Sequence, residues 1–459
     1  MSVLADLQSA FAPGRVIAPE HIPVGHRSDW GVALASDEQP AALVYAQDAD
    51  DVSRALAICT HHACPVVTQG GLTGLTGAAT PSHGCVIVSL ERMRAIEEID
   101  KAAATMTVQA GVALERVQQA ASEAGLFFPL DLGARGSCQI GGNIATNAGG
   151  NRVLRYGMAR DLVLGLEVVL ADGSVVTSLN KMQKNNAGYD IKHLFIGSEG
   201  TLGIITRAVL RLFPATTSES TALCAVSDYD ALLAFLAHAK ARLGPTLSAF
   251  EVMWPDFYRL ALEAHDMRPP LDDNHSAYVL LDTLGTDAEA DQTRFEETIA
   301  SALSEGLITD AVLAQSLNDS ERLWRLRGLA GEFSRVFSPR IDFDISVPIG
   351  DIGVFLERAY AALTMQWPAA RILSWGHIAD SNVHLSVSID EQPQPLEAVE
   401  RVIYGLVREY GGSISAEHGI GLLKKPFLDY SRSPAEIALM QRMKHALDPA
   451  GLLNPGKVL

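Results

Sequence analysis

The chain has 459 residues, of which 48% are hydrophobic and 20% are charged, so its composition predicts a folded protein with a large core and excludes a disordered chain. The formal net charge of −18 argues against nucleic acid and anionic membrane as partners, because both bind basic faces. Five cysteines, an odd number without CxxC spacing, predict buried thiols in a reducing compartment rather than a disulfide framework.

Residues 1–7 lack the basic start and apolar core of a signal peptide, and no run of 18 apolar residues occurs. We therefore expect a soluble, cytoplasmic protein without a membrane span. The length suits two or three domains, and two is our expectation.

Residues 43–46 predict a strand, and a helix over 48–59 follows, with acidic residues at its start and Val52, Leu56 and Cys59 at helical spacing. A strand at 65–67 completes this strand–helix–strand unit. The next predicted elements are short strands at 86–90, 96–99 and 106–110 and a helix over 113–124.

A first glycine loop follows the strand at 65–67, with glycines at 70, 71, 74 and 77. Free backbone N–H groups after a strand suit a pyrophosphate. The loop lacks the Rossmann fingerprint, because Pro81 follows where a helix would have to begin, and it lacks the Gly-Lys-Ser/Thr of a Walker loop. An extended dinucleotide held in another way is the natural prediction.

A second glycine run, residues 131–150, contains six glycines and small polar residues. Such a run offers backbone N–H groups that can approach a bulky cofactor closely. A set of tight turns between strands is the alternative reading. A third glycine cluster at 197, 200 and 203 leads into a strand, and Asp172-Gly173 between apolar residues predicts a hairpin.

Pro214 and the Ser/Thr-rich stretch 216–221 predict a domain boundary. Beyond it, helices are expected over 228–241 and 288–303, and strands over 278–282 and 341–347. This alternation predicts an α+β domain with helices on one face of a sheet.

His377 and His384 flank a stretch rich in turn-forming residues, which favours strand–turn–strand over helix. A hairpin would bring both rings together, and Glu417 would complete a two-histidine, one-carboxylate set for a divalent metal. His418 would not bind the metal and could act as a general base. The alternative is that these are ordinary polar residues at a domain junction.

Several motifs occur together in a characteristic order. They are Gly70-Gly-Leu-Thr-Gly-Leu, the run 129–150, Gly157 after Arg155-Tyr156, the stretch 195–206, Gly376-His-x5-Asn-x-His384, Glu417-His-Gly-Ile-Gly and Asn454-Pro-Gly-Lys. With them the chain resembles, over nearly its whole length, the FAD-linked D-2-hydroxyacid dehydrogenases, in particular the D-2-hydroxyglutarate and D-lactate dehydrogenase group, whose FAD domain is of the vanillyl-alcohol-oxidase type.

The resemblance implies an α+β protein with a two-part FAD-binding domain and an α+β substrate (cap) domain. Its boundaries would be 1–215 for the FAD-binding domain, 216–415 for the substrate domain and 416–459 for a C-terminal segment that returns to the FAD domain. FAD would be bound non-covalently, and the first glycine loop indeed offers no histidine or cysteine for attachment.

The resemblance also implies which residues bind FAD, with the first loop at the pyrophosphate, the second run along the flavin, residues 199–205 near the adenine and the C-terminal pair near the ring. They are Thr68, Gly70, Gly71, Leu72, Thr73, Gly74, Leu75, Thr76, Pro129, Leu130, Gly133, Ser137, Gly141, Gly142, Asn143, Thr146, Asn147, Gly150, Glu199, Gly200, Ile205, Asn454 and Lys457.

By the same resemblance, His377, His384 and Glu417 would bind a divalent metal, with Zn²⁺ expected. The substrate's α-hydroxyl and carboxylate would chelate the metal, which would lower the hydroxyl pKa. His418 would accept the hydroxyl proton while hydride leaves C2 for flavin N5, and Arg327 would hold a substrate carboxylate. Asn382 is a further expected substrate contact.

Three positions depart from the hydroxyglutarate pattern. Asp342 stands where a lysine is expected, Gly331 where a threonine is expected and Ser386 where an asparagine is usual. An acid at 342 would repel a distal carboxylate, which predicts a neutral D-2-hydroxyacid such as D-lactate. The alternative is that Arg340 replaces the lysine and hydroxyglutarate is the substrate.

Other readings are an oxidase of the same fold that uses dioxygen, a non-flavin metallohydrolase, and a catalytically silent scaffold. The dehydrogenase is our choice, with an electron-transfer flavoprotein, a quinone or a cytochrome as acceptor. A homodimer is expected from the family.

Overall fold

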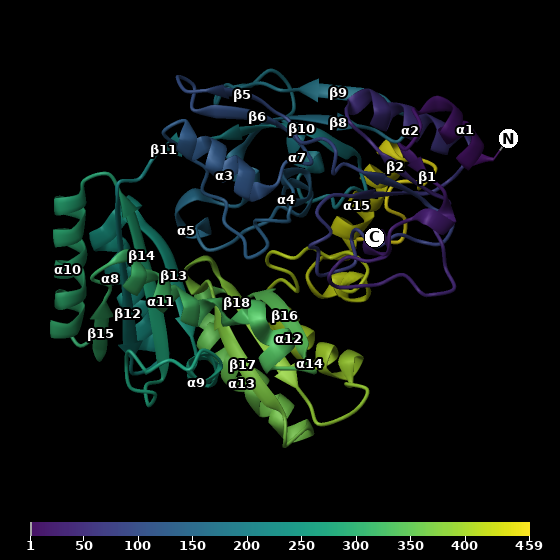
Figure 1. Cartoon of the computed structure of the whole chain (residues 1–459). Helices are drawn as coiled ribbons and strands as arrows, with labels where there is room; N and C mark the ends of the chain where they lie inside the picture. Colours follow the sequence, from purple (N-terminus) through teal and green to yellow (C-terminus); the bar gives the residue numbers. More distant parts are fainter. Residues whose placement is uncertain (1) are drawn as a thin grey trace. The chain divides into compact units, whose positions relative to one another are not determined.

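The structure is a computed structural model that describes residues 2–459. The chain forms two compact units (Figure 1). Unit 1 contains the residues up to Gly150 together with Gly157–Pro214 and Glu417–Leu459. Unit 2 contains Asn151–Tyr156 and Ala215–Ala416. The six residues 151–156 thus belong to unit 2, a crossing that the sequence did not indicate.

Unit 1 begins with a four-stranded sheet whose order is β1-β2-β4-β3. β2, β4 and β3 are parallel, and β1 pairs antiparallel with β2. An apolar cluster that includes Val44, Val52 and Val88 packs the first two helices on this sheet. The elements are α1 (Val3–Ala10), β1 (Val16–Ile17), β2 (Ala42–Tyr45), α2 (Ala49–His61), β3 (Val66–Gln69) and β4 (Val86–Ser89). The predicted strand–helix–strand unit is confirmed, and Asp48 caps α2 as its acidic start indicated.

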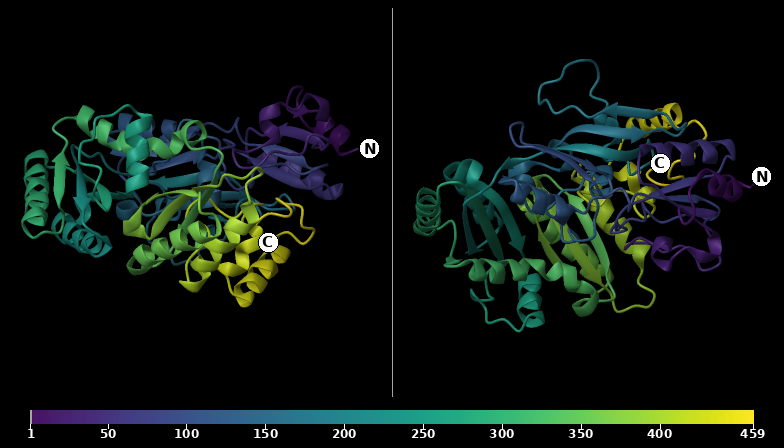
Figure 2. Two further views of the ribbon diagram at one scale, coloured as in Figure 1. Left: turned by 90° about the horizontal axis from the view of Figure 1, so that it is seen from below. Right: turned by 45° about the horizontal axis from the view of Figure 1, so that its top comes forward.

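A second, antiparallel sheet of unit 1 has the order β5-β6-β10-β8-β9. Its strands are β5 (Ile96–Asp100), β6 (Thr105–Gln109), β8 (Val163–Val169), β9 (Val175–Ser178) and β10 (Ile204–Arg211). β8 and β9 form the hairpin predicted at Asp172-Gly173. The loop from 179 to 191 after β9 extends away from this sheet (Figure 2). The helices of this part are α3 (Leu114–Glu123), α4 (Ile140–Thr146), α6 (Ala159–Leu162) and α7 (Lys192–Phe195), and β7 (Leu126–Phe127) pairs with β11 (Phe213–Pro214).

α4 lies inside the second glycine run, for which the sequence predicted no helix. Glycine is a poor helix former, so the pattern gave no helix signal. Packing explains the helix, because a Cβ at Gly141 would stand 2.7 Å from Ala110 Cβ. Only glycine therefore lets α4 approach the end of β6 this closely.

The C-terminal segment adds α15 (Pro434–Leu447) to unit 1 and then joins the first sheet. Leu453 forms a parallel bridge with Val66, and the backbone N–H of Asn454 donates to Val66 O at 2.8 Å. Residues almost 400 positions apart are thus neighbours on β3.

Unit 2 is built on a seven-stranded antiparallel sheet with the order β15-β12-β14-β13-β17-β18-β16 (Figure 1). The strands are β12 (Ser218–Val226), β13 (Leu247–Met253), β14 (Ala277–Gly285), β15 (Asp310–Leu313), β16 (Ile341–Ser346), β17 (Arg371–Gly376) and β18 (Asn382–Ser388). The helices are α5 (Val153–Tyr156), α8 (Tyr229–Leu243), α9 (Pro255–Ala264), α10 (Ala288–Ser304), α11 (Leu317–Arg327), α12 (Phe333–Val336), α13 (Ile352–Gln366) and α14 (Leu396–Glu409).

Helices pack against both faces of this sheet, so the expectation of helices on one face is wrong. Phe235 of α8 contacts Phe250 of β13 on one face. On the other face Phe257 of α9 and Leu326 of α11 share a core with Leu280 of β14. Every residue of β13 and β14 is buried, as expected for strands covered on both sides.

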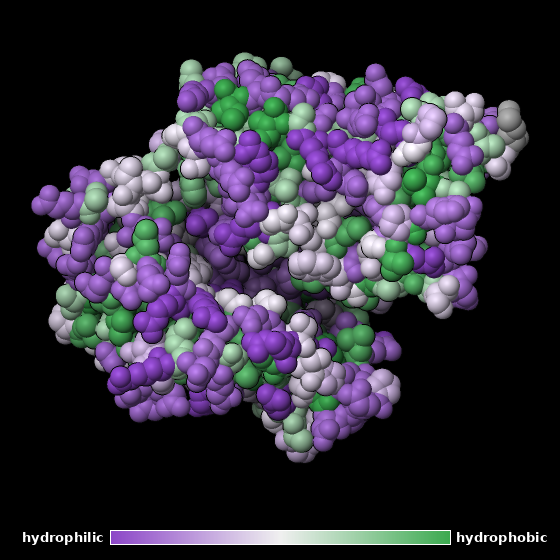
Figure 3. Space-filling model, in the orientation of Figure 1, coloured by the Kyte–Doolittle hydropathy of each residue, from purple (hydrophilic) through white to green (hydrophobic). Residues whose placement is uncertain are grey.

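On the face drawn in Figure 3, hydrophilic side chains predominate and apolar ones stand in small groups. Among residues 2–459, no helix combines the length and the apolar character that a membrane span needs.

Candidate active site

The two candidate metal-binding histidines lie on one hairpin of unit 2. β17 and β18 pair antiparallel, and residues 377–381 join them, so the predicted strand–turn–strand is confirmed. His384 pairs across the ladder with Trp375, and their rings stack at a centroid distance of 5.2 Å. The rings of His377 and His384 lie edge to face at 5.6 Å.

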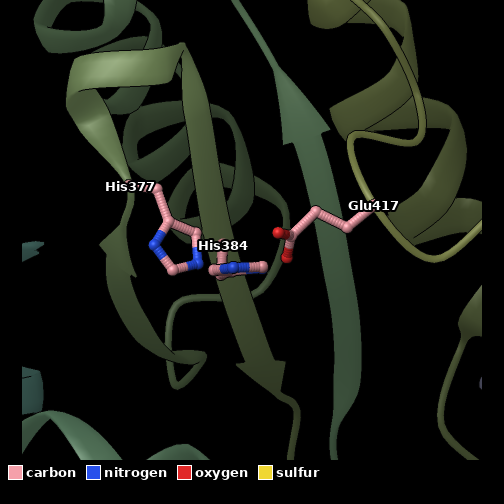
Figure 4. Close-up of side chains that lie close together, drawn as sticks. All are labelled: His377, His384 and Glu417. Atoms are coloured by element: carbon pink, nitrogen blue, oxygen red, sulfur yellow. The ribbon is translucent and has the colours of Figure 1, made fainter. Parts of the chain in front are cut away.

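Ligand atoms of His377, His384 and Glu417 lie within 4.8 Å of one another, and the three side chains point toward a common position (Figure 4). The chain reaches Glu417 through Ala416, whose backbone N–H donates to Asp344 O on β16 at 3.3 Å. Two imidazole nitrogens and one carboxylate suit a divalent transition metal that keeps open coordination positions. The donor set therefore fits the expected metal.

A second group joins Glu417 to Asp344 and His418, again with ligand atoms within 4.8 Å of one another. Asp344 is buried and accepts hydrogen bonds from Asn382 Nδ2 at 3.0 Å and Ser415 Oγ at 3.3 Å. The expected base, His418, is therefore placed beside two carboxylates.

Glu251 is a buried acid that sequence reasoning missed. Its Oε2 accepts a hydrogen bond from Arg327 Nε at 2.6 Å, and its Oε1 accepts one from His377 Nδ1 at 2.5 Å. Burial alone would raise the pKa of Glu251, but the adjacent His377 and Arg327 outweigh it and hold the pKa below its usual value. The available signal was the single charge in the apolar strand Leu247–Met253.

The departures from the hydroxyglutarate pattern lie along the same sheet. Asp342 pairs with Ser386 and Asp344 with His384 across β16 and β18, so all four side chains share one face. Asp342 accepts hydrogen bonds from Ser386 Oγ and from Arg340 Nε, the latter at 2.8 Å. Asp342 is thus paired with Arg340, the residue that was proposed to replace the expected lysine.

Asn382, an expected substrate contact, and Gly331, the third position that differs from the hydroxyglutarate pattern, also lie in unit 2. Asn382 is buried and uses its Nδ2 for Asp344 and for Ile345 O, while its Oδ1 has no hydrogen-bond partner within the described chain. Gly331 lies in the short 3-10 helix Gly328–Glu332, after Arg327.

The expected FAD-binding residues all lie in unit 1, where four distant segments meet at the end of β3. Asn454 connects them, because its Oδ1 accepts from the backbone N–H of Thr68 at 3.1 Å and its Nδ2 donates to Glu199 O at 2.6 Å. A Cβ at Gly200 would stand 2.9 Å from Asn454 Nδ2, and one at Gly71 would overlap Ser137 O. The glycines thus permit close backbone approach.

Several buried polar atoms around these segments have no hydrogen-bond partner among residues 2–459. They are Thr68 Oγ1, Gln139 Oε1, Asn143 Oδ1, Ser198 Oγ and Lys457 Nζ. Unpaired buried polar groups are costly and rare, so this cluster indicates a bound polar molecule. A dinucleotide with many donors and acceptors fits it. Burial lowers the pKa of Lys457 to about 8.

Other expected FAD-binding side chains also make hydrogen bonds within the protein. Thr146 Oγ1 donates to Gly142 O, and Asn147 Oδ1 accepts from the backbone N–H of Arg160 at 2.9 Å. The carboxylate of Glu199 accepts from the backbone N–H groups of Ile420 at 2.7 Å and Gly421 at 2.8 Å. Glu199 therefore holds the segment that follows His418.

Comparison with known proteins places the chain in a family. The family described as "FAD linked oxidases, C-terminal domain" matches residues 216–458, and the one described as "FAD binding domain" matches residues 40–178. A mitochondrial D-2-hydroxyglutarate dehydrogenase of Arabidopsis thaliana is 38% identical over 91% of this chain and 74% of its own length. A D-2-hydroxyglutarate dehydrogenase of Xanthomonas citri pv. viticola is 40% identical over 91% of this chain and 89% of its own. A putative mitochondrial D-lactate dehydrogenase of Schizosaccharomyces pombe is 36% identical over 88% of this chain and 79% of its own.

The fold is that of vanillyl-alcohol-oxidase-type flavoproteins. A solved structure of 4-ethylphenol oxidase from Gulosibacter chungangensis matches with a TM-score of 0.78 over 99% of this chain and 96% of that one, at 19% identity. The chain therefore belongs to the FAD-linked oxidase family and, within it, to the group that contains these FAD-dependent D-2-hydroxyacid dehydrogenases.

Proposed function

We propose that the protein oxidises a D-2-hydroxyacid to the 2-oxoacid with FAD as cofactor and a divalent metal, Zn²⁺ in our expectation, at His377, His384 and Glu417. The observation that carries the proposal is the convergence of these three ligands within 4.8 Å, next to Arg327, whose Nη2 lies 3.4 Å from His377 Nε2. A 2-hydroxyacid presents two adjacent oxygens that can bind a metal, and a negatively charged carboxylate that can pair with an arginine.

When bound, FAD supplies a two-electron acceptor and the metal supplies a Lewis acid. The chain's own residues bind and orient the substrate. Arg327 pairs with its carboxylate, and His418 accepts the proton of the C2 hydroxyl at an imidazole nitrogen. Asp344 and Glu417 lie beside His418.

The relatives named D-2-hydroxyglutarate dehydrogenase support a dicarboxylate substrate. The Arg340–Asp342 pair also supports a dicarboxylate substrate. Arg340 donates to Asp342 through Nε alone, which leaves its Nη groups for the distal carboxylate of the substrate. The rival substrate is a neutral acid such as D-lactate, which the relative named D-lactate dehydrogenase supports. Ser386 and Asp342 also favour a neutral acid, because they provide hydrogen-bonding groups on this part of the sheet but no net positive charge for a distal carboxylate.

The decisive experiment is anaerobic bleaching of the bound flavin's visible absorption by D-2-hydroxyglutarate, D-lactate and their L-enantiomers. We expect bleaching by a D-acid alone and its loss after treatment with a chelator, restored by Zn²⁺. Bleaching that survives complete metal removal would contradict the metal site. A flavin that no acid bleaches would contradict the substrate class.

The electron acceptor is a separate part of the proposal. We favour an electron-transfer flavoprotein, a quinone or a cytochrome over dioxygen, and we keep the cytoplasmic location and the homodimer as predictions. Stoichiometric hydrogen peroxide during aerobic turnover would instead identify an oxidase.

A further inference from the structure

We propose that Glu251 is a positioning residue that fixes both the tautomer of His377 and the direction of Arg327 with a single carboxylate. The inference deepens the proposed function and rests on it. All three residues lie in unit 2, on β13, at the end of α11 and directly after β17.

Glu251 is a charged residue in a fully buried strand, where a carboxylate is unfavourable unless it is paired. It is 1% exposed and lies in a strand whose seven residues are all buried. An unpaired carboxylate at such a place would carry a large desolvation penalty. Each of its oxygens bonds a different partner, Arg327 and His377, and both partners are buried as well.

The bond to His377 determines which ring nitrogen is available. A carboxylate is only an acceptor, so His377 Nδ1 must carry the proton that it donates to Oε1. In the neutral ring Nε2 then has its lone pair, which is the state that a metal ligand needs. Metal-bound histidines commonly donate their other N–H to a carboxylate in this way.

The bond to Arg327 determines where the guanidinium points. Nε donates to Glu251 and Nη2 is hydrogen-bonded to His377 Nε2, so the plane of the group is fixed and Nη1 remains for a substrate carboxylate. Nη2 lies 3.4 Å from His377 Nε2, which places the two functional groups side by side. One acid thus sets the spacing between metal ligand and substrate cation.

Glu251→Gln gives a directional test. Arg327 Nε is always a donor, so the new amide must turn its oxygen toward Arg327 and its NH₂ group toward His377. His377 Nδ1 then has to accept, and the proton moves to Nε2, where it blocks metal binding. We expect the Zn²⁺ affinity of the FAD-loaded, metal-free protein to fall by about 10- to 100-fold, measured by competition with a chromophoric chelator.

A second readout does not depend on the metal. Nitrogen-15 NMR of histidine-labelled, metal-free protein reports the tautomer directly, and the His377→Gln variant assigns the signal. We expect Nδ1–H in the wild type and Nε2–H in Glu251→Gln. The wild-type measurement stands even if Glu251→Gln does not fold.

Asp282→Asn is the matched control. Asp282 is 3% exposed on the neighbouring strand, opposite Ala249, and is bonded to Thr221 and Ser248 but not to His377 or Arg327. We expect this variant to bind Zn²⁺ as the wild type does. Equal losses in both variants, unchanged affinity in Glu251→Gln, or an Nε2–H tautomer in the wild type would overturn the inference. If the wild type binds no Zn²⁺, the metal centre of the proposed function fails, and the tautomer alone decides the role of Glu251.

Discussion

The carboxylate of Glu417 accepts a hydrogen bond from the backbone N–H of Gly150 at 2.6 Å. A Cβ at Gly149 would overlap the same carboxylate oxygen. The end of the second glycine run, which we assign to FAD, therefore also holds a proposed metal ligand in place.

Gly149→Ala should consequently weaken metal binding although no metal ligand is replaced. Gly149 has no left-handed backbone conformation, so alanine is tolerated there except for its contact with Glu417. We expect the Zn²⁺ affinity to fall about tenfold or more, or about 1.4 kcal/mol, as for other residues that orient a ligand. Gly136→Ala, in the same run, is the control, because its Cβ would meet only Glu115 at 3.5 Å. Equal affinities in the two variants would count against this account of Glu417.

Asp342→Asn should change the choice of substrate. The substitution removes the acid that pairs with Arg340 and leaves the arginine as a net positive charge. We expect the ratio of kcat/KM for D-2-hydroxyglutarate to that for D-lactate to rise about three- to tenfold, a modest change because half of the Asp342 side chain is exposed to solvent. Steady-state kinetics with both acids measures this ratio. An unchanged ratio would place the distal end of the substrate away from Asp342.

Asp282 should make unit 2 less stable as the pH rises. Burial raises its pKa from 3.8 to about 7, so the folded chain keeps a proton that the unfolded chain releases. This stabilisation is complete below about pH 4 and is lost as the pH rises through 7, up to roughly 4 kcal/mol over about three pH units. In Asp282→Asn, the free energy of unfolding should vary less between pH 4 and 8 and should exceed that of the wild type above pH 7. Denaturant unfolding across this range is the measurement, with the exposed Asp273→Asn as control.

Lys457 should make FAD binding depend on pH. Burial lowers its pKa to about 8, and the buried ammonium has no hydrogen-bond partner in the described part of the chain. An anionic cofactor favours the protonated form, so the affinity for FAD should fall as the pH rises through 8, by at most about tenfold per pH unit. Lys457→Met should bind FAD more weakly at pH 7 and lose this dependence. Flavin fluorescence titrations of the apoprotein, repeated with Lys425→Met, would test this, and a wild-type affinity independent of pH would contradict it.

The sequence was sufficient for features that are encoded locally. The glycine loop after β3, the hairpin at Asp172-Gly173 and the turn between β17 and β18 each depend on residues that are adjacent in the chain. Their side chains and backbone preferences fix the geometry without help from distant parts. Periodicity located α2, α8 and α10 for the same reason.

The parts that could not be predicted depend on distant partners. Glu251 is 126 residues from His377, and nothing in strand β13 reveals which residue its charge meets. α4 has two glycines near its start and forms because Gly141 fits against Ala110. The role of Glu199 as an acceptor for Ile420 and Gly421 likewise becomes visible only when segments over 200 positions apart meet.

The short excursion of residues 151–156 into unit 2 limits how the protein can be divided. Arg155 donates to Leu284 O on β14, and α5 packs against β13, the strand that carries Glu251. A gene fragment that encodes only residues 215–416 would lack this covering. Transplanting unit 2 between relatives would therefore require two cuts next to residues 151 and 156 as well as two around residues 215 and 416. Recombination only at the boundary near residue 215 would separate the seven-stranded sheet from α5, which packs against it.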